Sequence, residues 1–340
     1  MSVYIIAEAG VNHNGQLDLA IKLCDAAKEA GVDAVKFQTW KTENIVTAQA
    51  RQAVYQTENT GVKESQYDML KKLELSYDHF RYIQDYCQKI GIDFLSTPDE
   101  EESLAFLVSL GLPLIKVGSG EVTNIPYLRK IGSQKKPVIL STGMSNLAQV
   151  ATAYDTLLGA GAPSVALLHC TTNYPCPVDE VNLKAMCTLR DAFKCHVGYS
   201  DHTMGLEVPV AAVALGAEII EKHFTLDRTM EGPDHKASLE PQELKLMVQQ
   251  IRNIEAALGD GIKKLAAAEE ANYGRTNRSL HFMHSMKTGE LVSEGDIAIL
   301  RTEKILTPGV SPEFFDLLIG KTLARDVEDG AGVQFEDFIQ

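Results

Sequence analysis

Two histidines, His202 and His223, stand at the ends of consecutive segments whose composition is typical of buried β-strands. If neighbouring parallel strands end on the same face of a closed barrel, their side chains meet there. Two imidazoles that leave other coordination positions open suit a divalent metal ion that also accepts substrate oxygens. We therefore predict a metal on His202 and His223. The alternative is a neutral histidine pair that is hydrogen-bonded to Asp201 and Glu8.

Two lysines, Lys36 and Lys116, lie inside apolar strand segments, where an isolated pair of like charges is costly to bury. A bound phosphate or carboxylate group would balance both charges, and hydroxyl side chains occur at the ends of neighbouring strands. We predict one anion-binding pocket made of Lys36, Lys116, Thr97, Ser119, Ser141 and Ser200. In the alternative interpretation the lysines pair with Glu8, Glu121 or Glu221 in a purely structural network.

Other polar residues at predicted strand ends indicate further roles. Glu8 precedes a glycine-containing turn at residues 10–15, and its carboxylate could order water or accept a proton. In the turn after the last predicted strand, Asp234 could contact a polar sugar, with a simple turn as the alternative. Of the remaining histidines, we expect His169 and His196 to be hydrogen-bonded core residues, the more common role of a lone histidine.

Short apolar segments recur along the first two thirds of the chain, and helical patterns separate them. Several predicted helices, such as 17–30 and 77–89, are followed by a glycine that ends the helix and then by the next strand. This repetition indicates successive βα units, and eight of them occupy about the length of a (β/α)8 TIM barrel. An open doubly wound sheet is the alternative, but polar residues end nearly every strand rather than two or three at a switch point. The predicted strands are 3–10, 34–39, 93–98, 114–120, 137–143, 165–171, 196–202 and 217–224.

Two long segments and a change of composition complete the predicted domain organisation. Residues 41–66 and 225–241 follow strands and are long enough to cover or complete a site. We assign the barrel to residues 1–262, a linker to 263–278 and a small β-rich domain to 279–340. About sixty residues are near the lower limit for an independent core, so this domain is expected to pack against a barrel, its own or a partner's.

Composition narrows the class of protein. The chain has 340 residues, 45% of them hydrophobic, and a formal net charge of −14. Nucleic-acid binding is not expected, since it requires clustered basic surface, but local lysines could still attract an anionic substrate into a cleft. The six cysteines form no C-x-x-C pair, which favours reduced thiols of a cytoplasmic protein. Neither a signal peptide nor a membrane-spanning segment is expected.

Taken together, these segments resemble the sialic acid synthase family, the phosphoenolpyruvate-dependent synthases of nine-carbon sugar acids. Arg278 and the two residues after it resemble the start of the family's C-terminal antifreeze-like (SAF) domain, so the resemblance spans essentially the whole chain. Asp99 stands where many members have Phe, and Thr172 stands where some have Asn. The matching segments are AEAGVNHNG (7–15), VKFQT (35–39), FLSTP (94–98), IKVGSGE (115–121), ILSTGM (139–144), LLHCT (167–171), YSDHT (199–203), EKHFTLD (221–227) and GPDHKASLEP (232–241).

The resemblance implies site residues, a cofactor and an assembly. The cofactor would be a divalent metal, typically Mn²⁺ with Mg²⁺ or Co²⁺ as alternatives, on His202 and His223. Arg278 would reach the N-acetyl group of a sugar in the partner subunit's barrel, which implies a domain-swapped homodimer. The catalytic residues would be Glu8, Lys36 and Lys116. Phosphoenolpyruvate would bind Lys36, Thr97, Lys116, Ser119, Thr172 and Ser200. The acceptor sugar would contact Gln38, Asn59, Glu121, Tyr174 and Asp234.

The activity that this resemblance implies is the condensation of phosphoenolpyruvate, an N-acetylmannosamine-type sugar and water to N-acetylneuraminate and phosphate. Metal-assisted carbon–carbon bond formation and C–O cleavage of the phosphate ester are expected. An alternative acceptor is 2,4-diacetamido-2,4,6-trideoxymannose, which would give N,N'-diacetyllegionaminate. Other classes are a Schiff-base aldolase with Lys36 or Lys116 as nucleophile, and a non-catalytic carbohydrate- or ice-binding protein, which only the C-terminal segment favours.

Overall fold

The computed structural model describes residues 2–53, 56–57, 61–273, 276–302 and 305–339. The chain divides into two compact units, Met1–Asp260 and Gly261–Gln340. Each unit has its own core of buried apolar side chains. Among the described residues, no helix combines the length and the apolar character that crossing a bilayer requires.

The first unit is built on a parallel sheet in which each strand pairs with its neighbours in the sequence. The hydrogen-bonded order is β3-β2-β1-β8-β7-β6-β5-β4, and the two end strands, β3 and β4, also contact each other. Because the first strand pairs with the last and the remaining gap is closed by contact, the expected (β/α)8 barrel is confirmed and the open doubly wound sheet is excluded. The strands are β1 Tyr4–Gly10, β2 Ala34–Thr39, β3 Asp93–Pro98, β4 Ile115–Val117, β5 Val138–Ser141, β6 Val165–His169, β7 Val197–Asp201 and β8 Ile219–His223.

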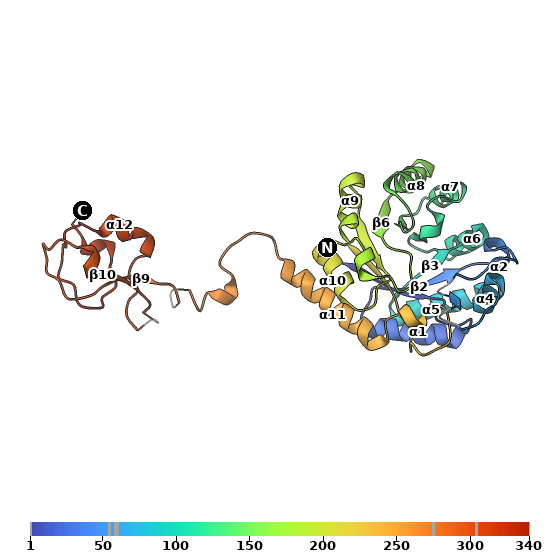
Figure 1. Ribbon diagram of the computed structural model, residues 1–340, viewed down its shortest axis with the longest axis horizontal. Helices are drawn as coiled ribbons and strands as arrows, with labels where there is room; N and C mark the ends of the chain where they lie inside the picture. Colours follow the sequence, from blue (N-terminus) through green and yellow to red (C-terminus); the bar gives the residue numbers. More distant parts are fainter. Residues whose placement is uncertain (1, 54–55, 58–60, 274–275, 303–304, 340) are drawn as a thin grey trace. The chain divides into compact units, whose positions relative to one another are not determined.

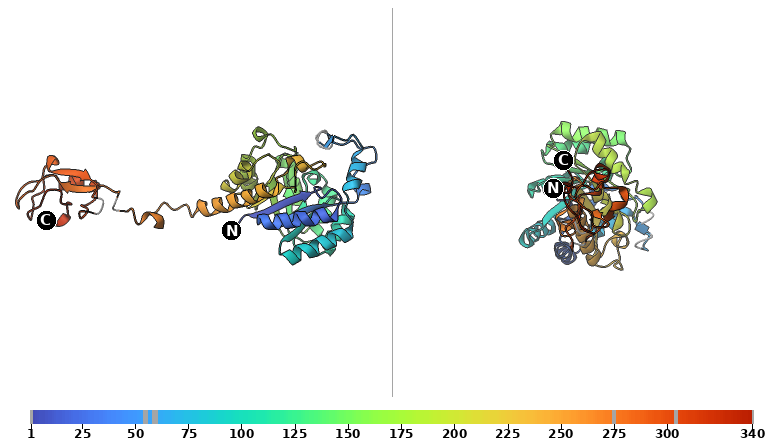
Figure 2. Two further views of the ribbon diagram at one scale, coloured as in Figure 1. Left: turned by 90° about the horizontal axis from the view of Figure 1, so that it is seen from below. Right: turned by 90° about the vertical axis from the view of Figure 1, so that its left-hand side faces the viewer.

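Helices cover the outside of this sheet, and α6, α7 and α8 follow one another around it (Figure 1). The last barrel helix, α11, packs along α1 and α10, and its position beside α1 is visible in Figure 2. As an example of local control, α1 ends at Gly31, whose left-handed backbone lets its N–H bond the carbonyl of Lys28. The helices are α1 Leu17–Ala30, α2 Thr42–Ile45, α4 Gln66–Leu73, α5 Tyr77–Ile90, α6 Glu101–Ser109, α7 Ile125–Ser133, α8 Leu147–Ala160, α9 Lys184–Phe193, α10 Glu207–Ala214 and α11 Pro241–Leu258.

Alternate residues of each strand point into the barrel and form two successive layers with opposite chemistry. The first, which we call the apolar layer, is a cluster made of Ile6, Ala34, Leu95, Ile139, Leu168 and Ile219. Two residues further along the same strands, side chains of the same parity form the polar layer: Glu8, Lys36, Thr97, Ser141, Cys170 and Glu221. Both layers are buried. The apolar layer therefore closes the barrel beneath the polar layer, which lies at the C-terminal ends of the strands.

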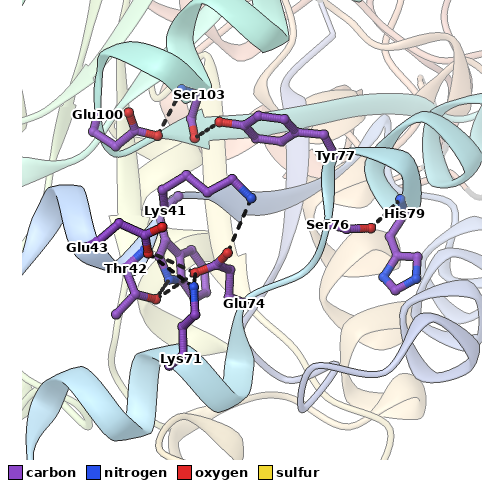
Figure 3. Close-up of polar contacts among 11 residues, drawn as sticks. Lys41, Thr42, Glu43, Lys71, Glu74, Ser76, Tyr77, His79, Glu100 and Ser103 are labelled. Atoms are coloured by element: carbon purple, nitrogen blue, oxygen red, sulfur yellow. Dashed lines mark hydrogen bonds and ion pairs between the residues drawn. The ribbon is translucent and has the colours of Figure 1, made fainter.

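In the segment after β2, which we expected to cover or complete a site, one carboxylate joins the start of the segment to its end. Glu74 accepts hydrogen bonds from the backbone N–H and the hydroxyl of Thr42, and it pairs with Lys41 and Lys71 (Figure 3). The contact joins the two short helices, α2 through Thr42 and α4 through Lys71. Apolar packing completes it with a small cluster of Val11, Trp40, Met69 and Leu73.

The second unit is rich in turns and has a two-stranded antiparallel sheet, β9 Ser279–Phe282 and β10 Ile297–Leu300, with one short helix, α12 Phe315–Leu318. Its core consists of Leu280, Phe282, Met286, Val292, Ile297, Leu318, Leu323, Val327, Val333 and Phe338. This small β-rich domain was expected from the sequence. The segment before it, residues 261–273, is exposed and contains only a single short turn of helix.

Candidate active site

A cavity of about 180 Å³ lies at the C-terminal ends of the barrel strands. All eight strands, or the loops directly after them, contribute to its lining. This is the face of the barrel on which the strand termini converge and where barrel enzymes build their sites. The residues proposed from the sequence that line the cavity are Glu8, Lys36, Gln38, Thr97, Lys116, Ser119, Ser141, Thr172, Tyr174, Ser200, His202 and His223.

The two lysines of the cavity are held by buried carboxylates. The Nζ of Lys36 lies 2.5 Å from Oε2 of Glu8 and 3.9 Å from Oε2 of Glu221. The Nζ of Lys116 lies 3.5 Å from Oε1 of Glu221 and donates a hydrogen bond of 2.7 Å to Oγ of Ser141. The pairing with Glu8 and Glu221 that we considered as an alternative is thus present, whereas Glu121 does not take part. The network holds both ammonium groups at the edge of the cavity.

Burial and neighbouring charges shift the pKa values of this network in opposite directions. Burial raises the pKa of Glu8 even though Lys36 opposes the shift. Burial also acts on Glu221, but Lys116 and Lys36 outweigh it and hold its pKa below the ordinary value. Burial lowers the pKa of Lys116, while Glu221 and Glu8 raise that of Lys36 against the effect of burial. Of the two carboxyls in this network, Glu8 is therefore the better suited to exchange a proton near neutral pH.

The two histidines meet as expected, with ring centroids 5.4 Å apart. Nδ1 of His202 donates a hydrogen bond of 2.7 Å to the carbonyl of Thr171, which leaves Nε2 without a proton in the neutral ring. Nδ1 of His223 has no hydrogen-bond partner among the described residues, and the nearest carboxylate oxygen, Oδ2 of Asp234, is 3.8 Å away. Burial lowers the pKa of both imidazoles, so both are neutral, the form that binds metal ions.

These donors fit a metal that takes only part of its ligands from the protein. In the part of the chain that the structure describes, no group of three or more His, Cys, Asp or Glu side chains is arranged to hold an ion. Two neutral imidazoles, one oriented by a backbone carbonyl, would leave most coordination positions to water and substrate. The alternative hydrogen bonds to Asp201 and Glu8 are not made. Asp201 instead pairs with Lys222 and accepts hydrogen bonds from Thr203.

The remaining predicted residues differ in position. Asp234 is buried beside His223, and burial raises its pKa to about 6. Glu121 lies in a turn next to the cavity and accepts a hydrogen bond of 2.7 Å from Asn124. Asn59 lies outside the described residues. Arg278 is exposed and belongs to the second unit.

Six cavity residues were not assigned to the site from the sequence: the glycines Gly118 and Gly120, and Asp99, Met144, Cys170 and Glu221. Strand parity could have indicated Cys170 and Glu221, because each follows an inward apolar residue by two positions. Asp99 comes directly after β3, and burial raises its pKa to about 7. Met144 lies on a left-handed turn after β5 and is 70% exposed, a placement without a sequence signal.

One histidine prediction is wrong. The side chain of His196 is 62% exposed and bonds Glu218 at 2.7 Å, so it is not a core residue. It precedes β7, at the end of the barrel where side chains reach solvent. His169 is half-buried and bonds the carbonyl of Val181 at 2.7 Å, as expected for a hydrogen-bonded interior histidine.

Buried ammonium, carboxylate, hydroxyl and imidazole groups surround one cavity at the C-terminal ends of the strands. This arrangement is typical of an active site in a (β/α)8-barrel enzyme. The model of the NeuB family matches residues 23–263, and that of the SAF domain matches residues 277–339. The chain belongs to the NeuB family. The resemblance to sialic acid synthases and the assignment as an enzyme of this synthase family are both confirmed.

Individual relatives cover nearly the whole chain. The N,N'-diacetyllegionaminic acid synthase of Campylobacter jejuni is 49% identical, over 96% of this chain and 97% of the relative. The enzyme of the same name from Legionella pneumophila is 44% identical, over 99% of this chain and 94% of the relative. The solved structure of an N-acetylneuraminic acid synthetase from Leptospira borgpetersenii is 35% identical with a TM-score of 0.71, and covers 80% of this chain and 90% of that structure.

Proposed function

We propose that this enzyme condenses phosphoenolpyruvate, an open-chain acetamido sugar and water to a nine-carbon sugar acid and phosphate. The observation that carries the proposal is one cavity in which two buried ammonium groups adjoin two neutral imidazoles. The ammonium groups suit the phosphate and carboxylate of phosphoenolpyruvate, and the imidazoles suit a metal ion that faces the sugar. The names of the relatives support the same reaction class.

For the acceptor sugar, the relatives favour the second of our two sequence-based hypotheses. The identities of 49% and 44% are to enzymes named for legionaminic acid, so we propose 2,4-diacetamido-2,4,6-trideoxymannose as acceptor and N,N'-diacetyllegionaminate as product. N-acetylmannosamine is the second candidate, and it is supported by the 35% identity to the Leptospira structure named for N-acetylneuraminic acid.

A divalent metal, Mn²⁺ in the first place and otherwise Mg²⁺ or Co²⁺, is proposed on His202 and His223. When bound, such an ion would act as a Lewis acid toward the aldehyde oxygen of the acceptor. The carbonyl of Thr171 orients His202 for this role through the hydrogen bond at Nδ1. The ring of Tyr174 lies against both histidine rings, with its centroid 4.1 Å from that of His202 and 5.4 Å from that of His223.

The protein's own residues would hold phosphoenolpyruvate and move protons. Lys36 and Lys116, with the hydroxyls of Thr97, Ser119 and Ser200, would bind its two anionic groups. The C=C π electrons of phosphoenolpyruvate form the bond from C3 to the aldehyde carbon, which leaves an alkoxide at the former aldehyde and a positive charge at C2. Water adds at C2, and one of its protons neutralises the alkoxide. The tetrahedral C2 then forms the keto group as its hydroxyl proton is lost to phosphate, which leaves by C–O cleavage. Glu8 accepts a hydrogen bond from Gln38 at 2.9 Å and is placed to take the proton of that water. Positioning of two polar reactants can supply up to ~7–11 kcal/mol of the activation free energy.

We also propose that the active assembly is a domain-swapped homodimer. Arg278 of one subunit would contact the N-acetyl group of a sugar bound in the other subunit's barrel. The proposal rests on the family resemblance and on the separate core of the second unit. Mixing an Arg278→Ala variant with a Lys36→Met variant tests it, because mixed dimers would regain one intact site and therefore turnover.

The central experiment measures phosphate release from phosphoenolpyruvate with Mn²⁺ and a panel of acetamido sugars. We expect release with the diacetamido sugar above that with N-acetylmannosamine, and no release after chelation. No release with any acetamido sugar would contradict the proposal. Phosphoenolpyruvate labelled with ¹⁸O at the bridging oxygen should yield labelled phosphate, whereas label in the sugar acid would exclude C–O cleavage. Trapping of a substrate on Lys36 or Lys116 by borohydride would favour the Schiff-base aldolase.

A further inference from the structure

A buried histidine outside the cavity lining, His235, joins two loops that lie far apart in the sequence. The ring is fully buried, with Nδ1 2.6 Å from Oγ1 of Thr225 and Nε2 3.1 Å from Oδ1 of Asn14. Nδ2 of Asn14 donates to the carbonyl of Glu231 at 2.9 Å, so Oδ1 of Asn14 must accept. Nε2 of His235 therefore carries the proton, and Nδ1 accepts from the hydroxyl of Thr225. The neutral His235 tautomer with its proton on Nε2 is therefore consistent with these three hydrogen bonds.

A second set of hydrogen bonds ties the same two loops together. Nδ2 of Asn12 donates to the carbonyl of Phe224 at 2.8 Å and to Oγ of Ser238 at 2.9 Å. Oγ of Ser238 in turn donates to the carbonyl of Asp234 at 2.7 Å. The backbone of Asp234 is thus held on one side through Ser238, and on the other through its neighbour His235. The Asn12 bonds connect the loop after β1 with the end of β8 and the segment after it, whereas the Ser238–Asp234 bond lies within that segment.

Close packing restricts the conformation of residues 232–239. A Cβ atom at Gly232 would lie 2.6 Å from Cδ2 of His235 and 2.9 Å from Oδ1 of Asn14, so the ring and the amide occupy the space that only glycine leaves open. At its far end the segment pairs again beside β8, where the N–H of Leu239 donates to the carbonyl of His223 at 2.9 Å. Asp234 is held between these two fixed points, with its carboxylate 3.8 Å from His223.

We infer that His235, together with Asn14 and Thr225, is a polar clamp whose task is to position Asp234 for the acceptor sugar. The clamp contacts neither of the lysines that would hold phosphoenolpyruvate, and it acts through the one carboxylate that faces His223 from the segment after β8. His235 is accordingly a positioning residue for the acceptor half of the site. This inference rests on the proposed function for the identity of the substrate, but not for the clamp itself.

The test uses three clamp variants and one control of the full-length protein. His235→Leu removes both hydrogen bonds, His235→Gln keeps an amide donor toward Asn14, and Thr225→Val removes only the hydroxyl. His196→Gln makes the same substitution as the second variant at an exposed histidine. Two readouts are taken: hydrogen–deuterium exchange of residues 232–239, and the KM values for phosphoenolpyruvate and for the acceptor sugar.

We expect His235→Leu to accelerate exchange in residues 232–239 and to raise the acceptor KM by about tenfold, with the phosphoenolpyruvate KM unchanged to within about twofold. Thr225→Val should show the same pattern more weakly, His235→Gln should recover part of the loss, and His196→Gln should match the wild type. If His235→Leu does not fold, the exchange rates and KM values of the Thr225→Val and His235→Gln variants test the clamp instead.

Unchanged exchange in folded clamp variants would overturn the clamp. Faster exchange with equal changes in both KM values, or with none, would overturn its role toward the acceptor. If the wild type releases no phosphate with any acetamido sugar, the proposed function is contradicted. The exchange measurement would still show whether the clamp exists. Each outcome therefore separates the two proposals.

Discussion

The apolar layer and the polar layer of the barrel come from the same strands, are similarly buried and differ by only two residues along each chain segment. In the apolar layer, side chains such as Ile6 and Leu168 fill the barrel interior. In the polar layer, Lys36, Glu8 and Glu221 occupy equivalent positions and must neutralise one another. Burying such groups costs free energy that apolar side chains would not. The comparison shows that the barrel gives up stability at one level to place reactive groups.

The largest expected effect is on turnover, at the two cavity histidines that lie next to the polar layer. His202→Ala or His223→Ala should lower turnover at least about a thousandfold, equal to roughly 4 kcal/mol of activation free energy, because each removes one of the two imidazole ligands proposed for the metal. Unfolding by urea should change little. Phosphate release measures the effect, with His196→Ala as control. Full turnover of either variant in chelated buffer would refute the metal proposal.

Within the polar layer, Lys36→Met should affect both activity and stability. The substitution leaves Glu8 and Glu221 with fewer opposing charges and should cost roughly 3–5 kcal/mol of unfolding free energy. Adding Glu8→Gln should restore part of the stability, because two uncharged side chains cost less to bury than an unpaired carboxylate. It should not restore the activity, because the methionine side chain at position 36 carries no positive charge to bind an anion. Urea titration and phosphate release are compared on the single and double variants. A double variant as unstable as Lys36→Met would show that the ion pair is not the cause.

The apolar layer should give the opposite profile. Leu168→Ala removes a fully buried side chain and should cost about 2–5 kcal/mol of unfolding free energy through the lost burial and the cavity left behind. The KM for phosphoenolpyruvate should stay within about twofold of the wild type in the folded fraction. A selective change of that KM would mean that the two layers are coupled more closely than their chemistry indicates.

The smallest expected effect is a dependence of stability on pH that arises at Asp99. Burial raises the pKa of Asp99 from 3.8 to about 7, so the folded state binds this proton more tightly than the unfolded state. The contribution to stability is therefore complete below about pH 4 and is lost as the pH rises through about 7. Asp99→Asn should remove this loss, and its advantage over the wild type should grow by roughly 1–3 kcal/mol between pH 4 and pH 8. Urea midpoints measured across this range test it, and parallel curves would contradict it.

Strand periodicity was sufficient to predict part of the cavity lining. Lys36, Lys116, Thr97 and Ser200 all line it, because in a parallel barrel the inward parity of each strand follows from its apolar residues. Strand periodicity could not predict which carboxylates pair with the two lysines. Glu221 takes the lysines whereas Glu121 turns to Asn124, a difference that depends on the distances between strands and on side-chain rotamers.

The sequence by itself determined the architecture and the kind of chemistry, since apolar periodicity dictates the barrel and residue type dictates which groups lie at its mouth. Only the tertiary structure decided how those groups are held. It showed Thr171 as the partner of His202, Lys222 as that of Asp201, and the contact of His235 with Asn14 across the sequence. The physical reason is that hydrogen bonds and ion pairs act over a few ångströms and are directional, so they depend on contacts that arise only after the chain has folded.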